Sequence, residues 1–278
     1  QQFNIFEGDI GKKYLPFSKQ ELLFPKTPVI DFLLQKKNES IEPFRVELGE
    51  VIPQNFLMPY GIETTSGYDA LLPLKTGEFL SLVETGKIDD KISRVHLLRN
   101  YQSPYFKFTN TKYILAKKMN SEGIYSAQGK TPDIFNQKNY KNVFEDKTVV
   151  IFENENYLPR VNFVNEDMDI SKINKDKTKT EWLVNEALKK EFIFNSDTNG
   201  YVLLSESIYS GWRASVNSKP VSILSGIDAL KLIPVQAGKN VISIEYKPDS
   251  FYYGKIISVF SLFCWGIFLV IHLLRKRK

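Results

Sequence analysis

The sequence has few of the side chains that build most metal and nucleophilic sites. Its 278 residues include one cysteine, Cys264, and two histidines, His96 and His272. One cysteine cannot form a disulfide within the chain. With so few cysteines and histidines, the body of the chain cannot hold a Cys/His zinc site or a Cys–His catalytic pair. We therefore predict no metal and no cofactor.

Net charge is also scarce once the C-terminus is set aside. The formal charge is +5, and Arg275, Lys276, Arg277 and Lys278 supply four of those charges. The other residues include 33 basic and 32 acidic side chains. A nearly neutral body gives no electrostatic basis for binding nucleic acid, so we predict no such partner. Hydrophobic residues make up 42% of the chain, which is enough to fill a folded core.

A long uncharged stretch lies just before the basic C-terminus. Residues 256–274 read IISVFSLFCWGIFLVIHLL, without a formal charge, and as a helix they would extend over roughly 28 Å. A core helix of that length would show a polar stripe, and none is visible. We predict a transmembrane helix over residues 251–274, with the lipid bilayer as partner. Tyr252 and Tyr253 lie where an interfacial aromatic belt would be.

The flanking charges predict an orientation. RKRK at residues 275–278 follows the span, whereas Lys255 alone immediately precedes it. The positive-inside rule then places the basic tail in the cytoplasm and the body outside the membrane. A cell-wall sorting signal would need an LPxTG-type motif just before the span, and the sequence there is YKPDSFYYGK. We expect either upstream transmembrane helices of the same polypeptide or a cleaved signal to deliver the body.

The body divides into two regions by pattern, and together they predict an α+β fold. Residues 1–146 mix helices and strands: Pro28–Lys37 and Leu74–Thr85 have helical spacing, whereas Pro43–Leu48 and Thr111–Lys117 are strand-like. Residues 147–250 are predicted to form an antiparallel β-sandwich.

The sandwich prediction depends on short apolar runs that are separated by turn signals. Lys147–Glu153 and Arg160–Val164 are strand-like, and Glu181–Lys190 favours a short helix. Five or six strands are expected between Glu191 and Lys247. Among them, Trp212–Leu224 has a hairpin pattern with its turn at residues 217–219.

Two groups of residues are candidates for binding a ligand such as a sugar. Tyr60, Tyr68 and Asp69 combine aromatic rings with a carboxylate, and Gly61 and Gly67 would let the backbone turn close to a ligand. The alternative is an aromatic loop that packs on the core.

Tyr209 and Trp212, on either side of Gly211, form the second candidate platform. The alternative is that Trp212 belongs to the apolar face of a strand. Two further motifs are more typical of ordinary surface loops than of ligand sites. Gly129–Thr131 lacks the glycine spacing of a phosphate loop, and Asp167–Asp169 lies in a run of charged residues.

Five segments of the chain, taken in order, resemble the C-terminal extracytoplasmic region of bacterial YfhO-like membrane proteins. The last is the longest and includes the GWRASVNSKPV hairpin and the YKPDSF segment before the span. The segments are Pro43–Gly49, Tyr60–Pro73, Ser103–Ala116, Glu153–Val164 and Gly200–Gly254.

This resemblance implies a function. YfhO-like proteins look like relatives of the GT-C glycosyltransferases, which take sugars from polyprenol-phosphate donors outside the cytoplasmic membrane. The chain would be an accessory domain that assists sugar transfer to a cell-envelope glycopolymer in a bacterium. The polytopic half that carries the catalytic acid in such enzymes has no counterpart here, so we expect no catalytic residue. The alternative is a single-pass surface module that binds carbohydrate or protein without catalysis.

Overall fold

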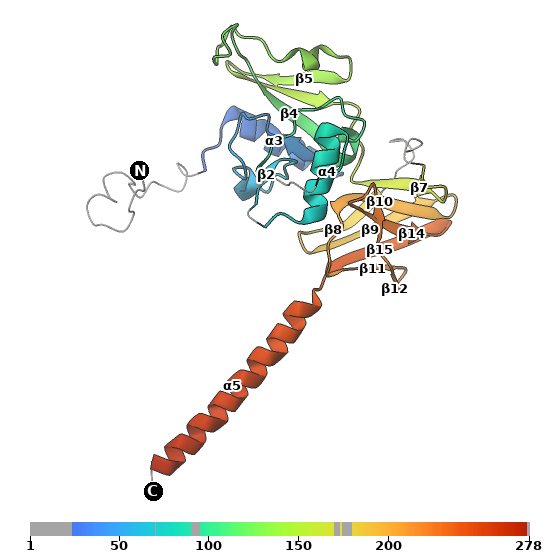
Figure 1. Cartoon of the computed structure of the whole chain (residues 1–278). Helices are drawn as coiled ribbons and strands as arrows, with labels where there is room; N and C mark the ends of the chain where they lie inside the picture. Colours follow the sequence, from blue (N-terminus) through green and yellow to red (C-terminus); the bar gives the residue numbers. More distant parts are fainter. Residues whose placement is uncertain (1–23, 70, 90–94, 170–172, 174–179, 277–278) are drawn as a thin grey trace, which may run out of the picture. The chain divides into compact units, whose positions relative to one another are not determined.

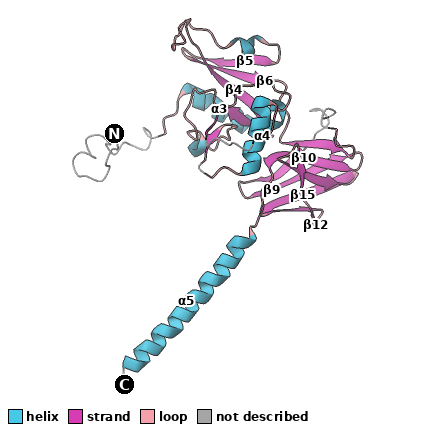
Figure 2. Cartoon of the chain, viewed as in Figure 1, coloured by secondary structure: helices cyan, strands magenta, loops and turns pink. Residues whose placement is uncertain are grey.

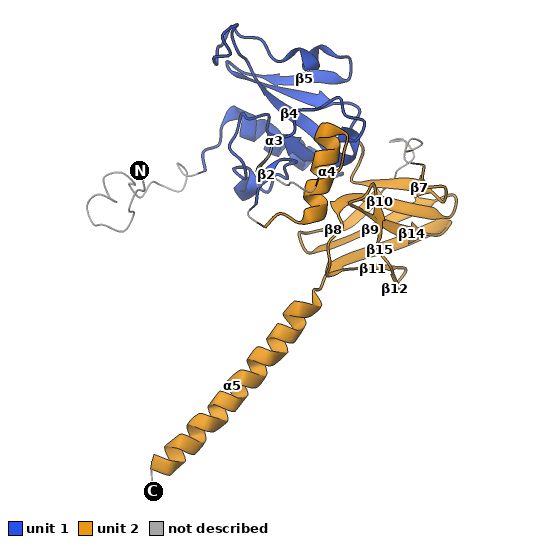
Figure 3. Ribbon diagram, in the orientation of Figure 1, with its two compact units in different colours: residues 1–69, 95–157 blue, residues 70–94, 158–278 orange. Residues whose placement is uncertain are grey.

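The computed structural model describes residues 24–69, 71–89, 95–169, 173 and 180–276 (Figure 1). Helices and largely antiparallel sheets occur together (Figure 2), which confirms the predicted α+β class. The chain forms two compact units (Figure 3). The first contains residues 1–69 and 95–157, and the second contains residues 70–94 and 158–278.

The first unit is built on a four-stranded sheet of order β1-β4-β6-β5, in which β1 runs parallel to β4 and the other pairs are antiparallel. A two-residue ladder, β2 with β3, lies apart from it. The elements are α3 (Pro28–Glu39), β1 (Arg45–Glu47), η1 (Met58–Tyr60), β2 (Gly67–Tyr68), β3 (Val95–His96), η2 (Phe106–Thr109), β4 (Thr111–Lys117), η3 (Asp133–Asn136), β5 (Tyr140–Glu145) and β6 (Val149–Asn154).

Helix α3 begins where the sequence predicts, for a local reason. The Thr27 hydroxyl accepts a hydrogen bond from the Ile30 amide at 3.4 Å, and Pro28 occupies the first turn, where its missing amide proton costs nothing. Val29, Ile30 and Leu33 then lie on one face and pack into a core cluster with residues of β1, β4 and β6.

The second unit begins with α4 (Leu74–Thr85), which ends at Gly86, as predicted. Gly86 has a φ of 74°, a left-handed conformation that glycine adopts without steric cost.

Two antiparallel sheets, of orders β13-β14-β10-β7 and β12-β11-β15-β9-β8, make up the rest of the body of this unit. The strands are β7 (Val161–Asn165), β8 (Thr180–Asn185), β9 (Lys189–Ser196), β10 (Gly200–Ser207), β11 (Trp212–Val216), β12 (Lys219–Val221), β13 (Leu224–Gly226), β14 (Leu230–Val235) and β15 (Gly238–Tyr246).

The two sheets enclose one core, which confirms the predicted sandwich. Alternate residues of each strand point inward, as the pleat requires. Fully buried side chains come from both sheets: Val202, Leu204 and Ile233 from one, and Phe192, Ile242 and Ile244 from the other. The hairpin of β11 and β12 turns at Asn217–Ser218, also as predicted.

One prediction about this region was wrong, and one predicted strand lies in the first unit. Glu181–Lys190 is not a helix: β8 occupies its first half, and β9 begins at Lys189. The period-two pattern prevails because Trp182 packs on the core, with its ring 5.0 Å from that of Phe192. The strand predicted at Lys147–Glu153 exists as β6, but it pairs with β4 and β5 in the first unit. The chain passes from the first unit to the second for the last time after residue 157, whereas the sequence pattern divides the two regions after residue 146.

Helix α5 (Asp249–Lys276) is 28 residues long, or roughly 42 Å, and among the described residues it is the helix long and apolar enough to cross a membrane. The two serine hydroxyls in its apolar stretch are satisfied within the helix: Ser258 donates to the Gly254 carbonyl at 2.9 Å, and Ser261 to the Ile257 carbonyl at 2.8 Å. Internal satisfaction of polar groups is what a bilayer interior demands.

Candidate functional site

The first candidate loop contains side chains with different roles. Tyr60 packs against the core of the first unit, and its hydroxyl donates to the Pro25 carbonyl at 2.9 Å. Its ring lies 6.3 Å from that of Phe56. Gly61, with a φ of 62°, closes the short helix η1. Tyr60 thus has the contacts expected of a packing residue.

Tyr68 and Asp69, in contrast, are exposed. The Tyr68 backbone is held by Asn55, whose side chain accepts from the Tyr68 amide at 3.1 Å and donates to the Tyr68 carbonyl at 2.7 Å. The Tyr68 ring is 49% exposed. It is therefore an outward-facing aromatic ring on a fixed backbone.

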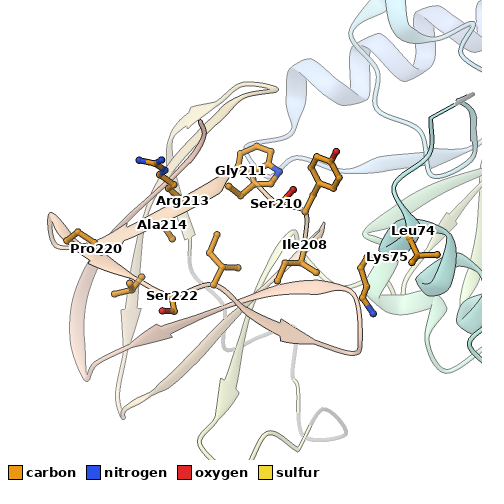
Figure 4. Close-up of a pocket in the computed structure, with 13 residues that line it drawn as sticks. Leu74, Lys75, Ile208, Ser210, Gly211, Arg213, Ala214, Pro220 and Ser222 are labelled. Carbon is orange, nitrogen blue, oxygen red and sulfur yellow. The ribbon is translucent and has the colours of Figure 1, made fainter. Parts of the chain in front are cut away.

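The second candidate pair lines a cavity of about 740 Å³ in the sandwich unit (Figure 4). Such a volume lies within the range of pockets that hold small ligands. Tyr209 lies between β10 and β11, and Trp212 is the first residue of β11. Apolar side chains make up most of the wall, and polar groups are few. The lining residues are Leu74, Lys75, Ile208, Tyr209, Ser210, Gly211, Trp212, Arg213, Ala214, Pro220, Val221, Ser222 and Ile223.

Gly211 shapes the aromatic wall of this cavity. Its φ is 97°, and a Cβ at this position would lie 2.9 Å from the Tyr246 ring and 3.1 Å from Pro248, so the chain passes too closely for any other residue. The close approach brings the Tyr209 and Tyr246 rings to 6.2 Å and the Trp212 and Tyr246 rings to 5.3 Å.

The cavity lies next to the start of α5. The Lys247 amide donates to the Gly211 carbonyl at 2.7 Å, two residues before α5 begins. The guanidinium of Arg213 forms an ion pair with Asp249, the first residue of α5. A ligand in this cavity would therefore lie close to the point where the chain leaves the sandwich for its apolar helix.

A buried cluster of charged groups lies behind the Trp212 indole. The Lys231 ammonium lies 4.0 Å from the centroid of the Trp212 ring and 3.3 Å from the Glu206 carboxylate. The same carboxylate accepts ion pairs at 3.1 Å from both Arg160 and Lys190. Arg160, Lys190 and Lys231 are each at most 5% exposed.

Sequence reasoning found Tyr209 and Trp212 but missed this cluster, although a signal for it exists. In the strands of the sandwich, inward positions alternate with outward ones. Lys190 precedes the inward Phe192 by two residues, Lys231 precedes the inward Ile233, and Glu206 follows the inward Leu204. Three charged residues thus continue the apolar faces of three strands, so a period-two reading would have placed each of them on an inward face, although not beside one another.

The two motifs that favour plain loops have the contacts of loops. The Gly129 amide donates to the Ser126 carbonyl at 2.9 Å, and the Lys130 amide to the Met119 carbonyl at 2.8 Å, so these amides do not form a phosphate cradle. Nearby, a hydrogen bond from Lys118 and a weaker one from Asn142 hold the pKa of Glu145 below its usual value.

Asp169, in the second motif, lines a separate cavity with Asn165 and Asp197. Among the described residues, no group of three or more His, Cys, Asp or Glu side chains could hold a metal ion.

The structure thus places the candidate residues in two sites, with Tyr60, Tyr68 and Asp69 in the first unit and Tyr209 and Trp212 in the second. Of these, Tyr209 and Trp212 line the cavity described above. Searches of family models, of curated proteins and of solved structures found no match to this chain.

Proposed function

We propose that this chain is the extracytoplasmic part of a membrane protein whose β-sandwich holds a carbohydrate ligand in the Tyr209–Trp212 cavity. The observation that carries the proposal is the cavity itself, with two aromatic rings on its wall and the start of α5 beside it. Aromatic faces and a few polar groups on a rigid scaffold suit an amphipathic ligand. Sugars are ligands of this kind, because their rings have C–H faces and hydroxyl edges.

The finer form of the proposal follows from the resemblance to YfhO-like proteins. The domain would assist the transfer of sugar from a polyprenol-phosphate donor to a cell-envelope glycopolymer, while upstream transmembrane helices of the same polypeptide supply the catalytic groups. The position of the cavity beside α5 supports this reading, because both the lipid-linked donor and a membrane-bound acceptor lie at the bilayer surface. In the alternative, a single-pass module uses the same cavity to bind carbohydrate without catalysis.

Tyr209→Ala tests the proposal, because Tyr209 is 49% exposed and its removal should leave the fold intact. We expect the full chain, in detergent or nanodiscs, to lose about tenfold in affinity for envelope-derived oligosaccharides, as loss of one aromatic contact of about 1.4 kcal/mol implies. Calorimetry or glycan-array binding would measure the change.

Tyr68→Ala is the matched control, since Tyr68 is also 49% exposed but belongs to the first unit. It should leave the affinity unchanged. If Tyr68→Ala weakens binding and Tyr209→Ala does not, the sugar site is the loop of the first unit and the proposed location is wrong. If the full chain binds none of the envelope-derived oligosaccharides, the proposed carbohydrate-binding function is wrong.

A further inference from the structure

The cavity has an unusual charge pattern around an otherwise apolar wall. Among the described residues that line it, the charged ones are Lys75 and Arg213, which are both cations. Their carboxylate partners, Glu78 and Asp249, do not line the cavity. The charged residues of its wall are therefore both basic, and the carboxylates that pair with them lie outside the lining.

A third cation lies behind the wall. Lys231 is 1% exposed, and its ammonium lies 4.0 Å from the centroid of the Trp212 ring, well within the range of a cation–π contact. Trp212 also lines the cavity, so the same residue contacts this buried ammonium and borders the ligand space. The Lys231 side chain reaches this position from β14, across the core from β11, which carries Trp212.

The surrounding ion pairs fix this cation in place. Glu206 accepts from Lys231 at 3.3 Å, but it also accepts from Arg160 and Lys190 at 3.1 Å each. The four groups of this cluster therefore include three positive charges and one negative charge. Three partners on one carboxylate restrict its orientation, and burial of the cluster keeps dissolved salt from screening it.

We propose that Lys231, acting through the Trp212 ring, makes the Tyr209–Trp212 cavity selective for anionic ligands, so that its ligand carries a phosphate or a carboxylate group. This deepens the proposed function, and it rests on that function for the carbohydrate nature of the ligand. An anionic group on the cavity side of the indole would lie about 8 Å from the ammonium, near enough for attraction across a poorly screened medium. A cationic group would be repelled over the same distance. Lys231 is a positioning and specificity residue, because it does not itself line the cavity.

Ionic quenching of Trp212 fluorescence tests the charge selectivity without a known ligand. The chain has three tryptophans, so Trp182→Phe and Trp265→Phe in the full chain leave Trp212 as the only emitter. Iodide, caesium and acrylamide serve as the anionic, cationic and neutral quenchers, at constant ionic strength. We expect the iodide-to-caesium ratio of quenching constants to exceed the same ratio for free N-acetyltryptophanamide by about twofold or more, because that reference removes the intrinsic difference between the two quenchers. Lys231→Met should reduce that ratio by about twofold or more.

Three comparisons make the result specific to the charge of Lys231. Acrylamide quenching should be the same in both proteins, which shows that the indole remains equally accessible. Lys231→Arg, which keeps the charge, should restore the iodide-to-caesium ratio. Lys239→Met removes an exposed lysine at the start of β15 and should leave the ratio unchanged. An iodide-to-caesium ratio no higher than that of free N-acetyltryptophanamide with Lys231 present, or a ratio that Lys231→Met does not change, would overturn the proposal.

A ligand pair separates this inference from the proposed function. Oligosaccharides that carry a uronate or a phosphate should bind more tightly than their neutral counterparts, and Lys231→Met should reduce that preference. If quenching shows anion selectivity but no saccharide binds, the anionic site stands and the carbohydrate function fails. If neutral and anionic saccharides bind equally well, the carbohydrate function stands and the inference about Lys231 is wrong.

Discussion

Glu206 pairs with three basic side chains in the sandwich cluster. Its side chain is 13% exposed and forms ion pairs with Arg160, Lys190 and Lys231 at the same time. A buried carboxylate of this kind is costly to desolvate, but its loss leaves buried cations facing one another. At the residue scale, Glu206 is therefore the shared carboxylate partner of three buried cations at the end of the sandwich core.

Glu206→Gln should lower the free energy of unfolding of the sandwich by about 3–5 kcal/mol, because it leaves three buried cations without their shared carboxylate. Denaturant unfolding followed by tryptophan fluorescence measures this. Glu166→Gln, at an exposed position after β7, is the control and should have little effect. Glu206→Gln combined with Lys231→Met should recover part of the loss, since one of the stranded cations is then absent. If Glu206→Gln lowers the free energy of unfolding by less than about 1 kcal/mol, Glu206 is not an important shared partner of the three cations.

At this same scale, the sequence predicted the aromatic residues of the site better than the charged ones. Tyr209 and Trp212 stand out because they flank a glycine before a strand pattern. Lys190, Glu206 and Lys231 do not, because a charged residue in a strand is expected to face solvent. Their convergence depends on which strands lie opposite each other, and single-strand patterns contain no such information.

At the element scale, the hairpin of β11 and β12 shows how local chemistry sets a turn. Asn217 and Ser218 have φ values of 51° and 66°, the signature of a tight hairpin turn with both central residues left-handed. The Asn217 side chain accepts from the Val241 amide at 2.9 Å, which ties the turn to β15. Asn217 is thus well suited to its position, whereas Ser218 is strained.

Ser218→Gly should raise the free energy of unfolding by about 0.5–1 kcal/mol, since glycine adopts a left-handed conformation without the Cβ penalty. A higher denaturant midpoint with an unchanged slope would show it. Ser222→Gly is the matched control: Ser222 is exposed and lacks a positive φ, so glycine there should be neutral or slightly destabilising. A midpoint that stays the same or falls in Ser218→Gly would refute the strain argument.

Most elements were predictable because their signals are local. The Thr27–Pro28 start, the Gly86 end and the apolar run of β4 are each contained within a few residues of sequence. The β8 segment failed because its short alternating pattern also fits one face of a helix. The contacts of Trp182 with the core decide in favour of a strand, and they include the ring of Phe192 on β9.

At the scale of the whole molecule, the two units are not successive pieces of chain. The first unit includes residues 1–69 and resumes at residue 95, and residues 70–94 belong with the sandwich unit. The sequence suggested two regions in series, split near residue 146. Patterns along the chain identify α4 as a helix, but they do not identify the unit that it joins, because that depends on contacts with strands far along the sequence.

The direction in which helix α5 crosses the bilayer would decide on which side of the membrane the sandwich lies. Asp249 and Lys255 lie at its first end, and Arg275 and Lys276 form its last turn with two further basic residues after it. The excess of positive charge at the C-terminal end favours a cytoplasmic C-terminus. That orientation would place the Tyr209–Trp212 cavity on the extracytoplasmic side, where the proposed sugar donors and acceptors occur.

Cysteine labelling of intact cells that produce the protein checks this orientation. In a Cys264→Ser background, a cysteine at Ser218 should react with a membrane-impermeant maleimide, because Ser218 is exposed on the β11–β12 turn. A cysteine added after Lys278 should react only after the cells are permeabilised. The reverse pattern would place the sandwich in the cytoplasm, away from any polyprenol-linked donor outside the membrane. The accessory role in sugar transfer would then fail, even if the cavity still bound anions.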